Sequence, residues 1–252
     1  MTKQEIIKKI RSNIENNENI VAAWEGGSKA TGNEDMYSDL DLMIVTQNDS
    51  KEITFNTMID YFASEFGIEH FYRVKEPTWH GFSQAFIKLK DTPDYFYIDM
   101  AVMTKNTEDK FYSENRHGKA TAWFDKEGVL DSKPLSKEII ENKKNALYER
   151  ATAIDFLFII ETKKQLYRQN FSEAFTSMYR FLQSSASVLF NLEHRPYQVD
   201  FGLRYAYRAY SKEDFNTIET CLKANSLSTL NKAFSDLLIR YEVLKQKHRP
   251  NS

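Results

Sequence analysis

The spacing of apolar and polar positions changes character near the middle of the chain. Up to about Leu130, short strand-like runs are interspersed with helical stretches, whereas the part after Pro134 has the spacing of long amphipathic helices throughout. This pattern predicts an α+β protein with two domains. A mixed sheet with flanking helices is expected over residues 1–131, followed by a helical bundle over residues 132–252.

Individual elements follow from the same periodicities and from turn residues between them. In the first part the pattern predicts helices at Lys3–Glu15 and Phe55–Phe66 and strands at Ile20–Trp24, Leu40–Val45, Glu69–Val74, Ser83–Leu89, Tyr95–Met103 and Thr121–Phe124. In the second part it predicts helices at Ser136–Arg168, Ser172–Leu192 and Leu227–Lys247, with shorter ones near Phe201–Tyr210 and Lys212–Lys223.

Composition narrows the classes of function. Of 252 residues, 41% are hydrophobic and 28% charged, as in ordinary globular proteins, and the net charge of -2 lacks the basic excess of a dedicated nucleic-acid binder. The single cysteine, Cys221, excludes an intrachain disulfide and is expected to be a core residue. The chain shows neither a signal peptide nor an apolar run of membrane-spanning length, so a cytoplasmic location without a membrane partner is expected.

Two aspartates open the second predicted strand. Asp39 and Asp41 are two positions apart, so on a strand both side chains would project to one face while Leu40 and Leu42 project to the other. Like charges so close together repel each other unless a cation lies between them. Carboxylates with substrate phosphate oxygens are the ligands that Mg²⁺ prefers, so Asp39 and Asp41 are candidate metal ligands.

A glycine turn precedes this strand. Gly26 and Gly27 end the strand before it, and Ser28 and Lys29 follow directly. Glycine allows a phosphate to approach the backbone, whose N–H groups together with the Ser28 hydroxyl could bind it, while Lys29 would offset its charge. A plain strand–turn–helix with Lys29 on the surface is the alternative explanation.

A third aspartate lies in a strongly apolar strand. Asp99 follows Tyr95-Phe96-Tyr97-Ile98 and is expensive to bury there unless it is paired or liganded. If its strand neighbours the strand of Asp41, Asp99 completes an acidic triad. A structural hydrogen bond at the strand end is the alternative.

Taken in order, these features resemble the DNA polymerase β-like nucleotidyltransferase superfamily. Gly27-Ser28, then Asp39 and Asp41 at the start of an apolar strand, then Asp99 in a later strand, are similar to the pattern of its bacterial aminoglycoside and lincosamide members. The resemblance covers about residues 20–103. It implies that Gly27 and Ser28 bind the triphosphate of ATP, with Lys29 beside them to offset its charge, and that Asp39 and Asp41 bind Mg²⁺. Asp99 would be a further metal ligand or the general base.

The resemblance further implies transfer of AMP from ATP to a hydroxyl of a small molecule, with an aminoglycoside-type antibiotic as the leading acceptor and residues 132–252 as the substrate or cap domain. Two other functions stay open at this point: nucleotidylation of a protein partner, and nucleotide binding without catalysis. Some antibiotic-modifying relatives take the base from the helical domain, where Glu141, Glu149 and Glu161 are available, although a solvated helix face explains these three better.

Two further segments stay ambiguous. Arg195, Arg204 and Arg208 form a basic cluster suited either to phosphate oxygens or to surface ion pairs. The segment Trp79–Phe82 lies between two predicted strands, either as a loop at the rim of a cleft or as a packed hairpin turn. The five histidines show no metal-ligand spacing, so structural roles are expected for them.

Overall fold

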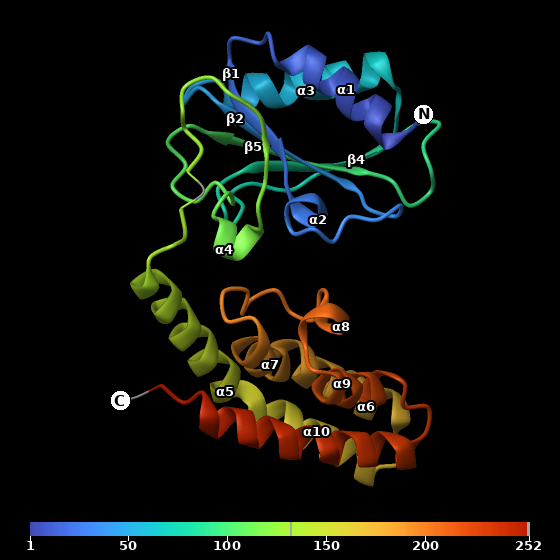
Figure 1. Ribbon diagram of the computed structural model, residues 1–252. Coiled ribbons are helices and arrows are strands. Elements are labelled where there is room, and N and C mark those ends of the chain that lie inside the picture. Colours follow the sequence, from blue (N-terminus) through green and yellow to red (C-terminus); the bar gives the residue numbers. More distant parts are fainter. Residues whose placement is uncertain (132, 251–252) are drawn as a thin grey trace. The chain divides into compact units, whose positions relative to one another are not determined.

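Two compact units make up the chain (Figure 1). The computed structural model describes residues 1–131 and 133–250, and it divides into Met1–Pro134 and Leu135–Ser252. The first unit is a mixed sheet with helices and the second is helical, so the predicted α+β class is confirmed. Each unit has hydrophobic cores formed from its own residues. The functions expected of the two domains stay predictions.

The first unit is organised around a six-stranded sheet in the order β3-β4-β5-β2-β1-β6. Its strands are β1 (Ile20–Glu25), β2 (Leu40–Thr46), β3 (Ile68–Arg73), β4 (Ser83–Leu89), β5 (Ile98–Thr104) and β6 (Ala122–Asp125). The described pairings are antiparallel except for β2 and β5, which lie side by side and run parallel. The strand of Asp99 therefore neighbours the strand of Asp41.

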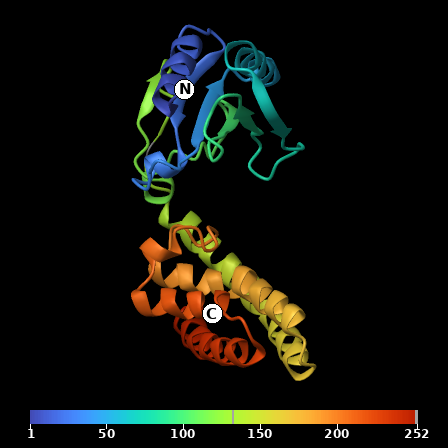
Figure 2. The ribbon, with the colours of Figure 1, turned by 90° about the vertical axis from the view of Figure 1, so that its right-hand side faces the viewer.

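The two faces of the sheet are covered differently. Helices α1 (Lys3–Ile14) and α3 (Lys51–Glu65) lie on one face in both views (Figures 1 and 2), and a large apolar core lies between them and the sheet. The second face has a smaller core, in which Met43 and Met103 pack against the segment that follows β5. This smaller core covers the later halves of β2 and β5. Asp41 and Asp99, the second residues of these strands, are half-buried.

Most predicted elements in this unit are present with small changes at their ends. Helix α3 begins at Lys51, four residues before the expected start, and its first turn is held by the Thr54 amide, which donates to the Ser50 carbonyl. Strand β5 begins at Ile98 and not at Tyr95, because a turn in which the Phe96 amide donates to the Pro93 carbonyl occupies the preceding residues. Short helices α2 (Gly27–Ala30) and α4 (Glu114–His117) complete the unit.

The second unit consists of helices around a single core in which Cys221 is buried, as expected. Its elements are α5 (Lys137–Tyr167), α6 (Phe171–Phe181), η1 (Leu182–Ala186), α7 (Ser187–His194), α8 (Ala206–Ala209), α9 (Lys212–Leu222) and α10 (Leu227–Lys247). The helix predicted at Ser172–Leu192 is interrupted by the π-helical turn η1. The helix predicted near Phe201–Tyr210 is reduced to α8, because Gly202 and Tyr205 adopt left-handed conformations that end a helix.

Candidate functional site

Asp41 and Asp99 lie directly beside each other. They are paired in the parallel register of β2 and β5, so their side chains project from the same face of the sheet. The alternating positions Leu40, Leu42, Ile98 and Met100 are fully buried against α1 and α3 on the other face. The sequence therefore aims both carboxylates away from the main core, because apolar residues at alternate positions hold each strand in that orientation.

Asp39 lies just before β2 and is half-buried. Its carboxylate is hydrogen-bonded to the phenol of Tyr97, which directly precedes β5. Burial raises the pKa of Tyr97 first, and the hydrogen bond to Asp39 and the charges of the neighbouring aspartates raise it further. The three predicted acids thus lie near the beginning of two adjacent strands, β2 and β5.

The glycine turn packs against the acid pair. Gly27 has a φ of +52°, and a Cβ built on it would lie 1.7 Å from Asp41 Oδ2. Any other residue there would collide with the carboxylate and would also adopt a left-handed backbone conformation that glycine alone accepts readily. The Gly26 amide donates to the Asp41 carbonyl at 2.9 Å. The turn that was predicted to bind phosphate therefore lies in contact with an acid that was predicted to bind metal.

Ser28 and Lys29 follow in the first turn of α2. The Ser28 side chain is buried, with the residue only 6% exposed, while Lys29 is exposed and forms an ion pair with Glu34 at 2.6 Å. The amides of Gly27, Ser28 and Lys29 begin this turn and so have no carbonyl within it to donate to. These amides and the Lys29 ammonium are close enough in sequence to act on one anion.

One basic residue near the site, Lys3, was not predicted from the sequence. Lys3 in α1 contacts Glu25 at 2.6 Å and Glu34 at 2.8 Å, and it donates to the Asp39 carbonyl at 2.8 Å. Burial favours the neutral amine, but the hydrogen bonds and charges of the two glutamates outweigh it and raise the pKa of Lys3. Lys3 thereby ties α1 to the residues before β2. No local pattern distinguishes it from the other lysines of that helix.

A second missed feature is a chain of hydrogen bonds that ends on Asp99. The Phe82 amide donates to His80 Nδ1 at 3.1 Å, so His80 carries its proton on Nε2, which lies 3.3 Å from Gln84 Oε1. The Gln84 Nε2 amide then donates to Asp99 Oδ1 at 2.7 Å. Burial lowers the pKa of His80, which favours this neutral form. In each of these hydrogen bonds, the donor lies on the side away from Asp99 and the acceptor on the side nearer to it.

The segment Trp79–Phe82, ambiguous in the sequence, is a loop between β3 and β4. Trp79 is 80% exposed, and the rings of Trp79, His80 and Phe82 all contact Phe111 from the segment after β5. The loop thus holds His80 in place to contact Gln84.

Arg195, one of the three arginines of the predicted cluster in the helical unit, has a structural role. Arg195 is buried and donates to the Asn191 side chain and to the carbonyls of Gly202 and Arg204. Burial lowers its pKa. Arg195 therefore shapes the loop after α7, and the prediction that it binds phosphate has no support in these contacts.

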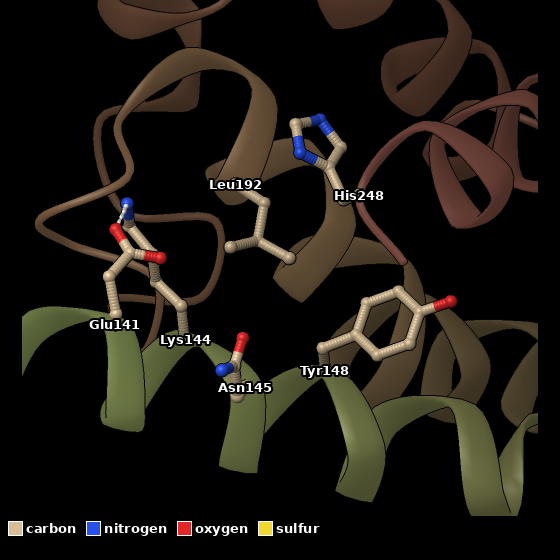
Figure 3. A pocket seen from close by; sticks show the side chains of 6 residues that line it. All are labelled: Glu141, Lys144, Asn145, Tyr148, Leu192 and His248. Atoms are coloured by element: carbon tan, nitrogen blue, oxygen red, sulfur yellow. Dashed lines mark hydrogen bonds and ion pairs between the residues drawn. The ribbon is translucent and has the colours of Figure 1, made fainter. Parts of the chain in front are cut away.

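The remaining candidates of the helical unit line a small pocket or the surface. A pocket of about 130 Å³ lies between α5 and the residues facing it (Figure 3), lined by Glu141, Lys144, Asn145, Tyr148, Leu192 and His248. It is smaller than the roughly 300 Å³ at which pockets for drug-sized ligands begin. Glu141 pairs with Lys144 and Glu161 with Lys164, as expected for a solvated helix face.

Over residues 1–131 and 133–250, no three His, Cys, Asp or Glu side chains are arranged as a metal-ligand set on their own. Within the same ranges, no helix is long and apolar enough to cross a membrane.

Comparison with known proteins yields structural likeness alone. No family model and no curated protein matches the chain. Among solved structures it is similar to an aminoglycoside 6-adenyltransferase from Bacillus subtilis, with 10% identity over 98% of this chain and 90% of that chain and a TM-score of 0.38. It is also similar to the structure of a GLD-2/RNP-8 complex, with 13% identity over 95% of this chain and 67% of that chain and a TM-score of 0.33. TM-scores this low carry no functional argument.

Proposed function

We propose that the chain is a magnesium-dependent nucleotidyltransferase that moves AMP from ATP to a hydroxyl of a small molecule, with an aminoglycoside-type compound as the leading acceptor. The observation that carries the proposal is the pairing of Asp41 with Asp99 while Gly27 lies against Asp41. This arrangement places two carboxylates, which can bind a metal ion, beside a glycine turn whose backbone other groups can approach closely. A metal-bound nucleoside triphosphate requires both a metal site and a phosphate site.

The residues fit a magnesium ion through the chemistry of their donor atoms. Mg²⁺ is usually held by one or two carboxylates together with phosphate oxygens of the substrate, so a protein need not supply three ligands by itself. Asp39 and Asp41 are proposed to hold it, with Asp99 as a further ligand or as the base. The bound ion would neutralise charge on the phosphates of ATP.

The protein residues have separate tasks in the proposed reaction. The amides of Gly27 and Ser28 and the Lys29 ammonium would bind the triphosphate. The acceptor oxygen forms a bond to the α-phosphorus, the bond from that phosphorus to the bridging oxygen breaks, and pyrophosphate leaves. The hydroxyl proton passes to Asp99, if Asp99 is the base, or to water. Gln84 keeps Asp99 Oδ1 occupied as an acceptor and so fixes the orientation of the carboxylate.

The direct test is a screen of acceptors with isotope-labelled ATP and Mg²⁺, in which the mass of each product is measured. The expected result is an acceptor that gains one AMP together with release of pyrophosphate. Label on a protein would favour a protein acceptor instead. Nucleotide binding with no label transferred to any acceptor and no pyrophosphate release would mean that the chain binds nucleotide without catalysis.

Asp99→Asn tests the role of the third acid. We expect ATP affinity, measured by calorimetry, to stay within about tenfold of wild type, because Gly27, Ser28 and Asp41 remain. Turnover should fall by at least ~10², in line with general-base contributions. If both quantities were unchanged, Asp99 would lie outside the chemistry. If ATP binding were lost while turnover at saturation was retained, Asp99 would belong to the nucleotide site.

A further inference from the structure

A row of paired residues crosses four neighbouring strands on the face that carries the acids. Tyr72 in β3 is paired with Phe86 in β4, Phe86 with Asp99 in β5, and Asp99 with Asp41 in β2. Directly paired residues project to the same face of a sheet, so all four side chains emerge side by side. Since strands lie about 4.8 Å apart, the backbone of Tyr72 is about 10 Å from that of Asp99.

The aromatic half of this row combines the exposed Tyr72 with the half-buried Phe86. Tyr72 is 62% exposed, and its ring is nearly parallel to that of Phe86, with 13° between the planes and 6.5 Å between the centroids. Tyr97 continues the surface toward Asp39, with its ring 6.1 Å from that of Phe86. On the opposite face of β4, Ala85 and Ile87 are fully buried. Exposed rings that adjoin a half-buried acid pair indicate a place where a ligand binds.

The order of the row separates the two substrates of the proposed reaction. Gly27 lies against Asp41, at one end of the acid pair, and Phe86 and Tyr72 lie at the other end, beyond Asp99. In an in-line displacement the attacking oxygen and the leaving group stand on opposite sides of the phosphorus. A triphosphate bound at Gly27 therefore leaves the aromatic end of the row to the acceptor.

The chemistry of the row selects the kind of acceptor. Aromatic faces carry a negative quadrupole and attract ammonium groups, and they also pack against the C–H faces of sugar rings. The adjacent acids add negative charge, while Lys88, the nearest cation along β4, donates to Thr92 and to the Pro93 carbonyl. An amine-bearing ring suits this surface better than an anionic ring does.

We propose that Tyr72 and Phe86 form the acceptor subsite and bind the ring of an amino sugar, which places its hydroxyl at Asp99. This inference rests on the proposed function for its catalytic meaning, but the binding itself can be measured without ATP. Tyr72 and Phe86 are specificity residues in this scheme.

The test compares variants on the two faces of β3. Tyr72→Leu removes a ring from the row, Tyr72→Phe keeps it, and Phe71→Leu removes a ring that is 46% exposed and lies at the neighbouring position, which projects to the opposite face. Kanamycin is the amine-bearing probe and trehalose the uncharged ring probe. Binding is followed by calorimetry, and by NMR through the upfield shifts that aromatic rings cause in ligand protons.

Kanamycin is expected to bind wild type and Tyr72→Phe alike, and Tyr72→Leu about 3- to 30-fold more weakly, the range of one cation–π contact. The upfield shifts should shrink in Tyr72→Leu and persist in Phe71→Leu, and trehalose should bind at least about tenfold more weakly than kanamycin. The subsite is refuted if kanamycin does not bind wild type, if Tyr72→Leu has no effect, or if Phe71→Leu weakens binding equally.

The proposed function and the subsite can fail separately. Kanamycin binding that depends on Tyr72, without AMP transfer from ATP to any acceptor, would leave the subsite in place and refute the nucleotidyltransferase proposal. AMP transfer to an acceptor whose KM is the same in wild type and Tyr72→Leu would support the enzyme and refute the subsite.

Discussion

At the scale of single residues, the candidate site depends on atomic contacts that no sequence motif specifies. Gly27 is required by its φ of +52° and by the Asp41 carboxylate that occupies the place of a Cβ. Gln84 is held between His80 and Asp99 by hydrogen bonds at both ends of its amide. Substitutions at these two residues keep the acids themselves, so they test how the carboxylates of Asp41 and Asp99 are positioned.

Gly27→Ala is expected to displace Asp41 and to lower AMP transfer by at least ~10², with unfolding free energy lowered by more than the ~1–2 kcal/mol of a left-handed alanine. The matched control is Gly32→Ala, where φ is +69° and a Cβ meets nothing within 4 Å. Urea unfolding and pyrophosphate release would be measured for both variants. Equal effects in the two variants would contradict the close approach of Gly27 to Asp41.

Gln84→Met keeps the length of the side chain but removes the amide that donates to Asp99. Because a hydrogen bond to a charged group contributes about 1.5–3 kcal/mol, kcat should fall about tenfold or more while the KM for ATP stays within about twofold. Gln47→Met is the control, since Gln47 donates to the carboxylate of Glu127 away from the acids. A rise in the KM for ATP with constant kcat would place Gln84 in the nucleotide site.

At the scale of elements, the connection from β3 to β4 is held by one partly exposed cluster of charges. Glu76 accepts from Ser83 at 2.7 Å and pairs with Arg73 and Lys51 at 3.0 and 3.1 Å. This cluster fixes both ends of the loop that carries His80. The positions of His80 and Gln84 therefore depend on an ion-pair network that lies outside the site.

Glu76 predicts how stability depends on pH. Burial raises the pKa of Glu76, but Ser83, Arg73 and Lys51 outweigh it and lower the pKa to about 2. A carboxyl whose folded pKa is lowered stabilises the fold above its unfolded pKa near 4.5 and loses that contribution as pH falls toward 2.

Urea unfolding at several pH values would compare Glu76→Gln with wild type. The variant should be less stable by about 1 kcal/mol at pH 7, a figure reduced for partial exposure, and the difference should vanish by about pH 2. A difference that did not depend on pH would show that the carboxylate charge contributes nothing.

At the scale of the whole molecule, the two units have separate cores. The described core of the helical unit includes no residue before Leu135, and the cores of the sheet unit include none after Pro134. Phe181 lies in the first of these, fully buried, with its ring 4.8 Å from that of Tyr241 and 5.9 Å from that of Phe234. Damage to one core should therefore stay within one unit.

Phe181→Ala is expected to lower the unfolding free energy of the helical unit by about 3–5 kcal/mol through the cavity that it leaves. Hydrogen exchange followed by mass spectrometry should show faster exchange over residues 135–250 and unchanged exchange in the sheet unit. Tyr167→Ala, at a position 84% exposed, is the control and should change neither unit. Equal loss of protection in both units would mean that they unfold together.

Local pattern was enough to predict a mixed sheet followed by helices, with most of the strands and the long helices. Periodicity carries that information because apolar residues at regular spacing have to face a core. It did not separate α6 and α7 from η1, since one π-helical turn shifts the apolar spacing by only a single residue. The pattern also extended β5 back to Tyr95, because aromatic residues are common in strands. The turn that occupies these positions in the structure left no mark on the apolar pattern.

The tertiary structure alone decided which distant residues meet. Asp99 lies beside Asp41 because β5 pairs with β2 in a parallel register, and strand pairing is set by packing across the whole sheet. The pairings of β4 with β5 and of β3 with β4 bring in Gln84, Phe86 and Tyr72, none of which belongs to a motif. Sequence therefore indicated the candidate-site residues whose spacing along the chain is local. It did not indicate those that meet only through the pairing of distant strands.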